Sequence, residues 1–209
     1  MIKVLMADDH AIVRRGLRQI LNEGAASCQI EEAVNGQEVM NKVYDGIFDI
    51  LVLDISLPDR NGLELVREIK SVKPKLPILM LSAHPEDQYA IRALKAGVSG
   101  YLNKESAPEQ LVQAIERIVA GGRYISPSLA ETLAANVGGN SDALPHEALS
   151  DREFTVLLRM GAGRSASEIA DELGLSVKTV STYRSRILEK MSMNSNADLI
   201  RYVIDHQLV

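Results

Sequence analysis

The segment FDILVLDISLPDRNGLELV (residues 48–66) is the most informative about the fold of the N-terminal half of this chain. Its apolar run, Ile50–Leu53, is followed by Asp54 and then by a loop that contains Pro58. An amphipathic stretch begins at Gly62 and continues to Val72. A short apolar run that ends in a polar loop and leads into a helix predicts one strand and one helix of a parallel sheet.

The same unit occurs five times in residues 1–121. The predicted strands are Ile2–Ala7, Cys28–Val34, Ile50–Leu53, Ile78–Leu81 and Gly100–Leu102. The predicted helices lie near Ala11–Leu21, Gly36–Tyr44, Gly62–Val72, Glu86–Ala96 and Pro108–Ala120. Alternation of this kind predicts an α/β domain in which helices cover a doubly wound, five-stranded parallel sheet.

Length and composition bound the remaining possibilities. The chain has 209 residues, of which 46% are hydrophobic and 4% aromatic. This length suits two domains with real cores, and the scarcity of aromatic residues argues against stacking platforms for single-stranded nucleic acid. Cys28 is the single cysteine, and no apolar run approaches the roughly 18 residues of a membrane span. We therefore expect a cytoplasmic protein without a membrane partner.

A second domain is predicted after a linker. Residues 122–145 are rich in Gly, Ser, Asn and Pro, which favours a tether between a domain at 1–121 and one at 146–209. Four serines precede helical patterns and are predicted N-caps: Ser150, Ser165, Ser176 and Ser195. Gly174 supplies the left-handed backbone of a sharp helix-to-helix turn. The sequence thus predicts a small all-α domain of four helices that contains a helix-turn-helix.

Basic residues are concentrated in one predicted helix. The whole chain has a net charge of −5, but residues 177–191 hold four cations against one acid. In a helix-turn-helix this helix enters the major groove of double-stranded DNA. The residues predicted to contact DNA are Lys178, Thr179, Ser181, Thr182, Arg184, Ser185, Arg186 and Lys190. We expect the cations to supply most of the affinity through phosphates. The alternative is a solvated helix in a protein-binding module.

Acidic residues follow two of the predicted strands. Asp8 and Asp9 come after the first strand, and Asp54 comes after the third. Because the carboxyl ends of parallel strands face one crevice, we expect the three carboxylates to meet. Carboxylates that converge repel one another unless a cation lies between them, and their oxygen ligands suit Mg²⁺. The alternative for Asp8 and Asp9 is a helix N-cap.

Two further side chains complete a predicted phosphoryl pocket. Ser82 and Lys104 follow the fourth and fifth strands and offer a hydroxyl group and a mobile positive charge. With them, Asp54 is the candidate nucleophile that accepts a phosphoryl group. We interpret His10 and His84 as solvent-facing loop residues.

The motifs MADDH, LVLDISLPDRNGLELV, ILMLSAH and GYLNK together resemble the receiver domain of bacterial response regulators. The stretch LSDREFTVLLRMGAGRSASEIADELGLSVKTVSTYRSRILEKM resembles a LuxR-type helix-turn-helix. In this order they resemble the NarL/FixJ family, which implies a flavodoxin-like receiver. The resemblance implies that a sensor histidine kinase phosphorylates Asp54, and that Asp8, Asp9, Asp54 and the backbone carbonyl of Ser56 hold Mg²⁺. It also implies a phosphate-sensing switch made of Ser82, Tyr101 and Lys104.

The leading hypothesis is a transcription regulator, not an enzyme, that binds promoter DNA as a homodimer when phosphorylated. One alternative is a Mg²⁺-dependent phosphohydrolase with an aspartyl-phosphate intermediate. Haloacid dehalogenase-like phosphatases have a second Asp where this chain has Ser56, which argues against it. The other alternative is a DNA-binding dimer that is never phosphorylated. Tyr101 has its own alternative as an edge aromatic. Two positions depart from the commonest receiver pattern: Ser82 replaces Thr, and Glu105 replaces Pro.

Overall fold

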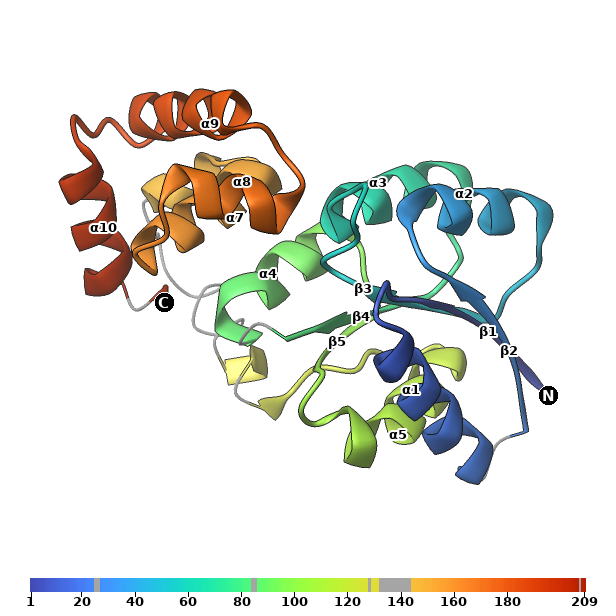
Figure 1. The fold of residues 1–209 in the computed structure, drawn as a ribbon. Helices are drawn as coiled ribbons and strands as arrows, with labels where there is room; N and C mark the ends of the chain where they lie inside the picture. Colours follow the sequence, from blue (N-terminus) through green and yellow to red (C-terminus); the bar gives the residue numbers. More distant parts are fainter. Residues whose placement is uncertain (25–26, 84–85, 128, 132–143, 207) are drawn as a thin grey trace. The chain divides into compact units, whose positions relative to one another are not determined.

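The computed structural model describes residues 1–24, 27–83, 86–127, 129–131, 144–206 and 208–209. The chain forms two compact units, Met1–Val137 and Gly138–Val209. The N-terminal unit contains the sheet, and the described part of the C-terminal unit is helical (Figure 1). Within the described residues, no helix combines the length and the apolar character needed to cross a membrane.

The sheet of the N-terminal unit has five parallel strands in the order β2-β1-β3-β4-β5. The strands are β1 (Ile2–Ala7), β2 (Cys28–Ala33), β3 (Ile50–Asp54), β4 (Ile78–Ser82) and β5 (Gly100–Asn103). All five predicted strands are confirmed. The strand order reverses at β1, and in such folds the crevice at the carboxyl ends of the strands beside the reversal is where ligands bind.

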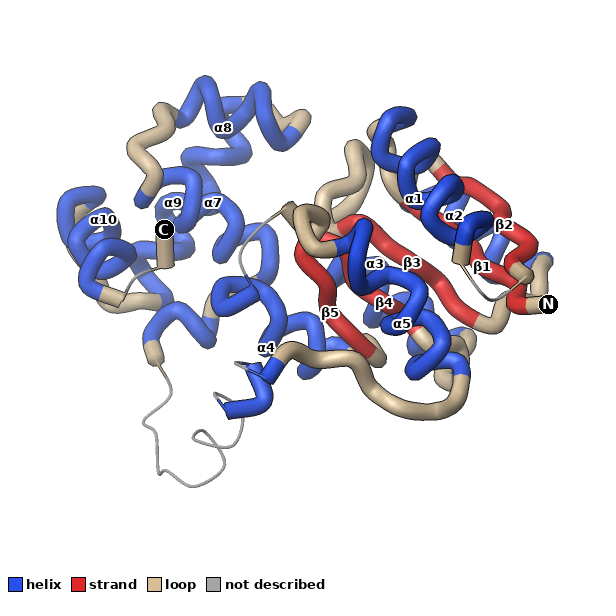
Figure 2. The backbone as a smooth tube through the Cα atoms, turned by 90° about the horizontal axis from the view of Figure 1, so that it is seen from below, coloured by secondary structure: helices blue, strands red, loops and turns tan. Residues whose placement is uncertain are grey.

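Helices cover both faces of this sheet. Their bounds are α1 (Ala11–Glu23), α2 (Gly36–Asp45), α3 (Gly62–Val72), α4 (Glu86–Ala96) and α5 (Ala107–Val119). Figure 1 shows α1 and α5 on one face and α2, α3 and α4 on the other. In the view from below, α1 and α5 lie side by side over the strands (Figure 2). The predicted doubly wound α/β fold is confirmed.

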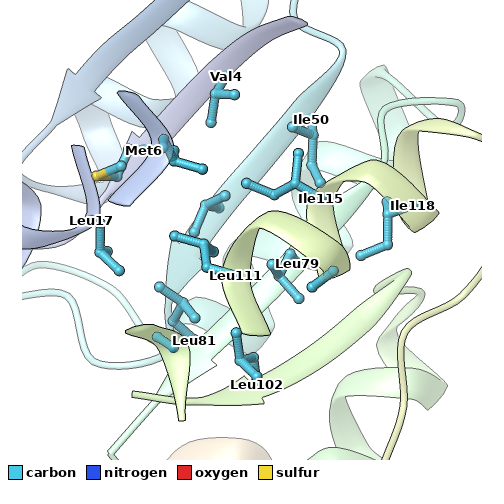
Figure 3. Close-up of a cluster of buried hydrophobic side chains, with 14 residues drawn as sticks. Val4, Met6, Leu17, Ile50, Leu79, Leu81, Leu102, Leu111, Ile115 and Ile118 are labelled. Carbon is cyan, nitrogen blue, oxygen red and sulfur yellow. The ribbon is translucent and has the colours of Figure 1, made fainter. Parts of the chain in front are cut away.

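The core under α1 and α5 explains why the strand sequences are continuous apolar runs. Leu111, Ile115 and Ile118 of α5 point at the sheet, where they meet side chains such as Leu79 (Figure 3). Every residue of β3 and of β4 is buried, because helices cover both faces. Burial of one such large aliphatic side chain contributes about 1.5–3 kcal/mol.

The C-terminal unit contains the predicted four helices. They are α7 (Asp151–Gly161), α8 (Ala166–Leu173), α9 (Val177–Lys190) and α10 (Asn196–Asp205), after a 3₁₀ turn at Pro145–Ala148. Each of the four predicted serine N-caps accepts a hydrogen bond from the backbone N–H three residues later. Gly174 has φ 63° between α8 and α9, which confirms the left-handed turn residue.

The predicted linker is described only near its ends. Tyr124 pairs with β5, because its N–H donates to Ser99 O at 3.0 Å and its carbonyl accepts from Tyr101 N at 3.2 Å. The residues up to Tyr124 therefore pack with the N-terminal unit. At the other end, His146 Nδ1 lies 2.8 Å from Tyr202 Oη, which ties the 3₁₀ turn to α10. Residues 128 and 132–143 lie outside the described residues.

Candidate functional site

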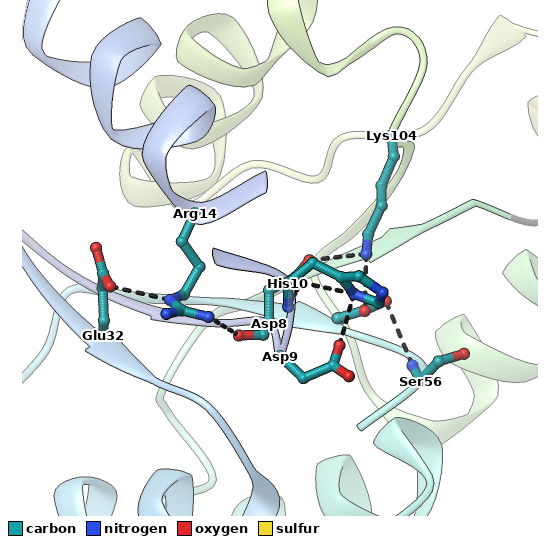
Figure 4. A network of polar contacts seen from close by, with 8 residues as sticks. Asp8, Asp9, His10, Arg14, Glu32, Ser56 and Lys104 are labelled. Atoms are coloured by element: carbon teal, nitrogen blue, oxygen red, sulfur yellow. Dashed lines mark hydrogen bonds and ion pairs between the residues drawn. The ribbon is translucent and has the colours of Figure 1, made fainter. Parts of the chain in front are cut away.

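The carboxyl ends of four strands bring Asp8, Asp54, Ser82 and Lys104 together, as predicted. Asp8 and Asp54 are only 1% and 2% exposed. The Lys104 ammonium donates a hydrogen bond to Asp54 Oδ2 at 2.7 Å and forms an ion pair with Asp8 Oδ2 at 2.7 Å (Figure 4). Ser82 is buried at the end of β4, and its carbonyl accepts from Lys104 N at 2.8 Å.

Asp9 and His10 complete the acidic cluster at the start of α1. His10 Nδ1 lies 2.7 Å from Asp9 Oδ1 and 3.4 Å from Asp8 Oδ1. Candidate ligand atoms of Asp8, Asp9, His10 and Asp54 all lie within 4.8 Å of one another. His10 is exposed, as expected, but it also contacts the acids, which we did not predict although it follows them directly. His84 lies outside the described residues.

Asp8 and Asp9 do not cap α1. The N-cap position is His10, and its side chain makes no capping hydrogen bond. The Asp8 carboxylate instead accepts from His10 N at 2.7 Å in the loop before the helix. The helix-cap alternative is therefore wrong.

The arrangement fits a divalent cation. Asp8 Oδ2 is buried, and among the described residues its close contact is the ion pair with the Lys104 ammonium at 2.7 Å. Three carboxylates converge where a single ammonium offsets their charge. Carboxylate oxygens are ligands that Mg²⁺ prefers, so Asp8, Asp9 and Asp54 have the chemistry to hold this ion.

The electrostatics of the pocket follow from its burial. Burial raises the pKa of Asp54; the Lys104 charge opposes this effect, and the neighbouring Asp8 charge adds to it. Burial alone would lower the pKa of Lys104, but the Asp54 and Asp8 carboxylates hold that pKa above its usual value. Lys104 thus remains an ammonium, and the site favours additional positive charge.

The loop after Asp54 is held from both ends. Gly62 N donates to Ile55 O at 2.8 Å, and a Cβ atom at Gly62 would lie 2.7 Å from Asp54 O. Asp59 accepts hydrogen bonds from Gly36 N at 2.7 Å and from Gln37 N at 3.0 Å, at the start of α2. The role of Asp59 was not predicted, because its partners are more than 20 positions away in the chain.

Tyr101 and the segment after β5 have defined places. Tyr101 is 1% exposed although β5 is an edge strand, so its ring points into the unit and is not a solvent-facing edge aromatic. Glu105, which stands where many receivers have Pro, donates its N–H to Asn103 Oδ1 at 2.8 Å. Local hydrogen bonds therefore shape the loop that carries Lys104.

The predicted DNA-contacting residues lie on α9. Val180 and Ile187 are buried, whereas seven of the eight predicted residues are exposed and Thr179 is half-buried. A hollow of about 310 Å³ lies over the first turns of this helix. It is lined by Ser176, Lys178, Thr179, Thr182, Tyr183 and Arg186. Tyr183 is half-buried and also lines this hollow.

The cations of α9 differ in what they contact. Lys190 Nζ donates to Glu153 Oε2 on α7 at 2.6 Å, and Arg184 Nε donates to Asn196 Oδ1 on α10. Within the described part of the chain, Lys178 and Arg186 have no ion pair. They are the cations of α9 that remain available to an anionic partner.

The hydroxyl groups of α9 are bonded to their own helix. Thr182 Oγ1 donates to Lys178 O at 3.0 Å, and Ser185 Oγ donates to Ser181 O at 3.1 Å. Such i−4 bonds engage the hydroxyl hydrogens that base contacts would use.

Comparisons with known proteins divide the chain in the same way. Residues 4–116 match the response regulator receiver domain, and residues 147–203 match the bacterial regulatory proteins of the luxR family. Fold and site thus define the class: a two-component response regulator with a receiver and a LuxR-type DNA-binding domain. The chain belongs to the NarL/FixJ family, which confirms the resemblance seen in its motifs.

Full-length relatives support this assignment. The chain is 34% identical to the response regulator UvrY of Escherichia coli (strain K12), with 100% of this chain and 96% of that protein covered. It is also 34% identical to the response regulator GacA of Pseudomonas aeruginosa, with 100% and 98% covered. A similar solved structure is RcsB of Salmonella enterica serovar Typhimurium bound to the promoter rprA in the presence of the phosphomimetic BeF₃⁻. Its TM-score is 0.64 and its identity 26%, with 97% of this chain and 98% of that chain covered.

Proposed function

We propose that phosphorylation of Asp54 by a sensor histidine kinase controls how this regulator binds promoter DNA. The observation that carries the proposal is the placement of Asp54. It is a buried carboxylate at the carboxyl edge of the sheet, 2.7 Å from the Lys104 ammonium and beside Asp8. Phosphoryl transfer needs little more than a placed nucleophile and positive charge.

The chemistry at Asp54 is a direct transfer. A carboxylate oxygen of Asp54 forms the bond to phosphorus while the bond from phosphorus to the donor imidazole nitrogen breaks. Lys104 offsets charge on the phosphoryl oxygens, and Ser82 offers a hydroxyl group to the product. Asp8, Asp9, Asp54 and the carbonyl of Ser56 would hold Mg²⁺, which would supply positive charge to the phosphoryl oxygens.

The switch runs through the fourth and fifth strands. Ser82 pairs in register with Asn103, and Met80 pairs with Tyr101. The carbonyl of Ser82 also holds the N–H of Lys104. A phosphoryl group that draws Ser82 and Lys104 toward Asp54 therefore acts on the strand that carries Tyr101, and so biases a two-state element.

DNA binding uses α9 in the major groove. Lys178 and Arg186 contact phosphates. The hydroxyl hydrogens of Thr182 and Ser185 are engaged within the helix, so the hydroxyl oxygens make permissive base contacts as acceptors. Such weak contacts gain from pairing, because two linked modules on adjacent half-sites bind far more tightly than one. The active form is accordingly a homodimer. The protein acts in the cytoplasm, and its two domains have proposed limits of 1–121 and 146–209, with the residues up to Tyr124 packed against the first domain.

Mass spectrometry tests the phosphoacceptor. Incubation with acetyl phosphate and Mg²⁺ should add about 80 Da to the intact protein, and Asp54→Asn should abolish this gain. Asp45→Asn, at the exposed end of α2, is the matched control and should gain the same mass. An Asp54→Asn variant that still gains the mass would place the phosphoryl group elsewhere.

Selection from random duplex DNA tests the control of binding. The protein with beryllofluoride and Mg²⁺ should recover a motif with paired half-sites. Its affinity for that motif should fall when beryllofluoride is omitted, and Asp54→Asn should show no response to the phosphate analogue. Equal affinity of the parent protein in both conditions would contradict phosphorylation control.

A further inference from the structure

Arg14 on α1 joins the acidic site to the second strand. Its Nη1 donates to the backbone carbonyl of Asp8 at 2.9 Å, and its Nε donates to Glu32 Oε2 at 2.9 Å. Figure 4 shows the Arg14 side chain between Glu32 and Asp8, on the opposite side of Asp8 from Lys104. The side chain is 14% exposed. This arginine is therefore fixed in place by two partners on different strand ends.

Arg14 donates its hydrogen bond to the backbone of Asp8 just beyond the end of strand β1. β1 ends at Ala7, and the N–H of Asp8 still donates to Ala33 O at 3.2 Å. The carbonyl of Asp8 lies one step beyond the last strand residue, and its hydrogen bond comes from the Arg14 side chain. Arg14 thus restrains the backbone of Asp8, while Lys104 and the N–H of His10 contact its carboxylate.

Glu32 accepts a hydrogen bond from the Arg14 guanidinium group and balances its positive charge. It lies on β2 opposite Met6 of β1 and also pairs with Arg18. Burial alone would raise the pKa of Glu32, but hydrogen bonds from Arg14 and Arg18 hold it below its usual value. The Arg14 charge is therefore paired locally, so its effect on a cation at Asp8 is one of geometry more than of repulsion.

We infer that Arg14 is a positioning residue of the cation site, which orients the Asp8 carboxylate by holding the Asp8 carbonyl against β2. The inference rests on the proposed Mg²⁺ site and deepens it. Groups behind metal ligands that fix their orientation typically contribute a 10–100-fold effect on metal affinity.

The test is Mg²⁺ affinity, measured by titration of backbone amide chemical shifts in the isotope-labelled full chain. Arg14→Gln should weaken Mg²⁺ binding about 10-fold. Arg15→Gln, one exposed position further along α1, is the matched control and should bind as the parent does. Arg14→Lys should recover part of the affinity, because it keeps a donor for the Asp8 carbonyl but loses the fork to Glu32.

Glu32→Gln provides a second variant that leaves Arg14 in place and removes its anchor. It should also weaken Mg²⁺ binding, and it carries the test if Arg14→Gln fails to fold. If the parent binds Mg²⁺ and the Arg14→Gln and Glu32→Gln variants have Mg²⁺ affinities within twofold of the parent's, the inference is wrong. The proposed Mg²⁺ site would then still stand. A parent that binds no Mg²⁺ would overturn the metal site of the proposed function, and this inference with it.

Discussion

Asp54 illustrates how burial sets the properties of a single residue. The sequence indicates a carboxylate that is ionised at neutral pH. The structure adds that this carboxylate is buried beside Asp8, which together raise its pKa against the opposing effect of Lys104. A phosphoacceptor in this setting is destabilising until a cation arrives, because charge in a low-dielectric site has a free-energy cost.

Replacement of Asp54 by Asn should therefore stabilise the N-terminal unit. A carboxyl group whose pKa is raised by folding costs no stability below its unfolded pKa, and the cost appears as the pH rises through its folded pKa. At pH 7 without Mg²⁺, Asp54→Asn should raise the midpoint of thermal unfolding by about 3–5 °C, the response to ~1 kcal/mol in a unit of this size. The gain in midpoint should shrink as the pH falls toward about 4, the pKa of the unfolded carboxyl group, and should be absent below it. Excess Mg²⁺ should also reduce the gain. A midpoint below that of the parent at pH 7 would contradict this account.

At position 62, close contact with neighbouring backbone atoms requires glycine. A Cβ atom there would meet Asp54 O at 2.7 Å and Ile55 Cα at 2.8 Å, and neither is the end of a flexible side chain. Gly62→Ala should lower the free energy of unfolding by about 1–3 kcal/mol in urea denaturation. Gly16→Ala on α1, where nothing lies within 4 Å of the new atom, should raise it by about 0.5–1 kcal/mol. Equal effects at both positions would show that contact is not the cause.

Among the helices, α9 has lysines with different contacts at its two ends. Lys190 in its last turn binds Glu153, the same residue that completes the capping box of α7. Lys178 in the first turn is exposed beside the hollow of Tyr183 and Arg186. One end of the helix is thus attached to its own domain, and the other end faces outward.

This division predicts different effects on DNA affinity. Lys178→Gln should weaken binding to duplexes of any sequence and reduce the slope of log K against log salt by about 1 per bound module. Lys190→Gln should leave the slope nearly unchanged and should lower stability, because it leaves buried Glu153 without its cation. Fluorescence anisotropy over a salt series measures both. An equal loss of slope in the two variants would show that Lys190 releases Glu153 to reach phosphate.

On the scale of the whole molecule, two compact units carry separate sites. The acidic pocket lies in Met1–Val137, and α9 lies in Gly138–Val209. A ligand that binds only the folded first unit should raise the free energy of unfolding of that unit alone. The increase is about 2.7 kcal/mol when the ligand concentration is 100 times Kd.

Beryllofluoride with Mg²⁺ should therefore shift one thermal unfolding transition of the parent protein to a higher temperature, as measured by calorimetry. Asp54→Asn should not show the shift, and Asp45→Asn should show it in full. A shift that persists in Asp54→Asn would place the ligand outside the acidic pocket.

Features that depend on near neighbours could be predicted from the amino-acid sequence. The serine caps and Gly174 act within three or four residues, and the strands are short apolar runs, so local pattern was sufficient for both. The convergence of Asp8, Asp54 and Lys104 also followed from the sequence, because parallel strands present their carboxyl ends at one edge.

Contacts between side chains that are distant in the sequence could be seen only in the folded protein. The bonds of Arg14 to Glu32, of Asp59 to Gly36 and of Lys190 to Glu153 join residues 18, 23 and 37 positions apart. Hydrophobic periodicity places elements in layers but does not encode how far a polar side chain reaches across them. Burial is decided in the same way, because Asp54 lies in a low-dielectric pocket only once the strands and loops around it have packed.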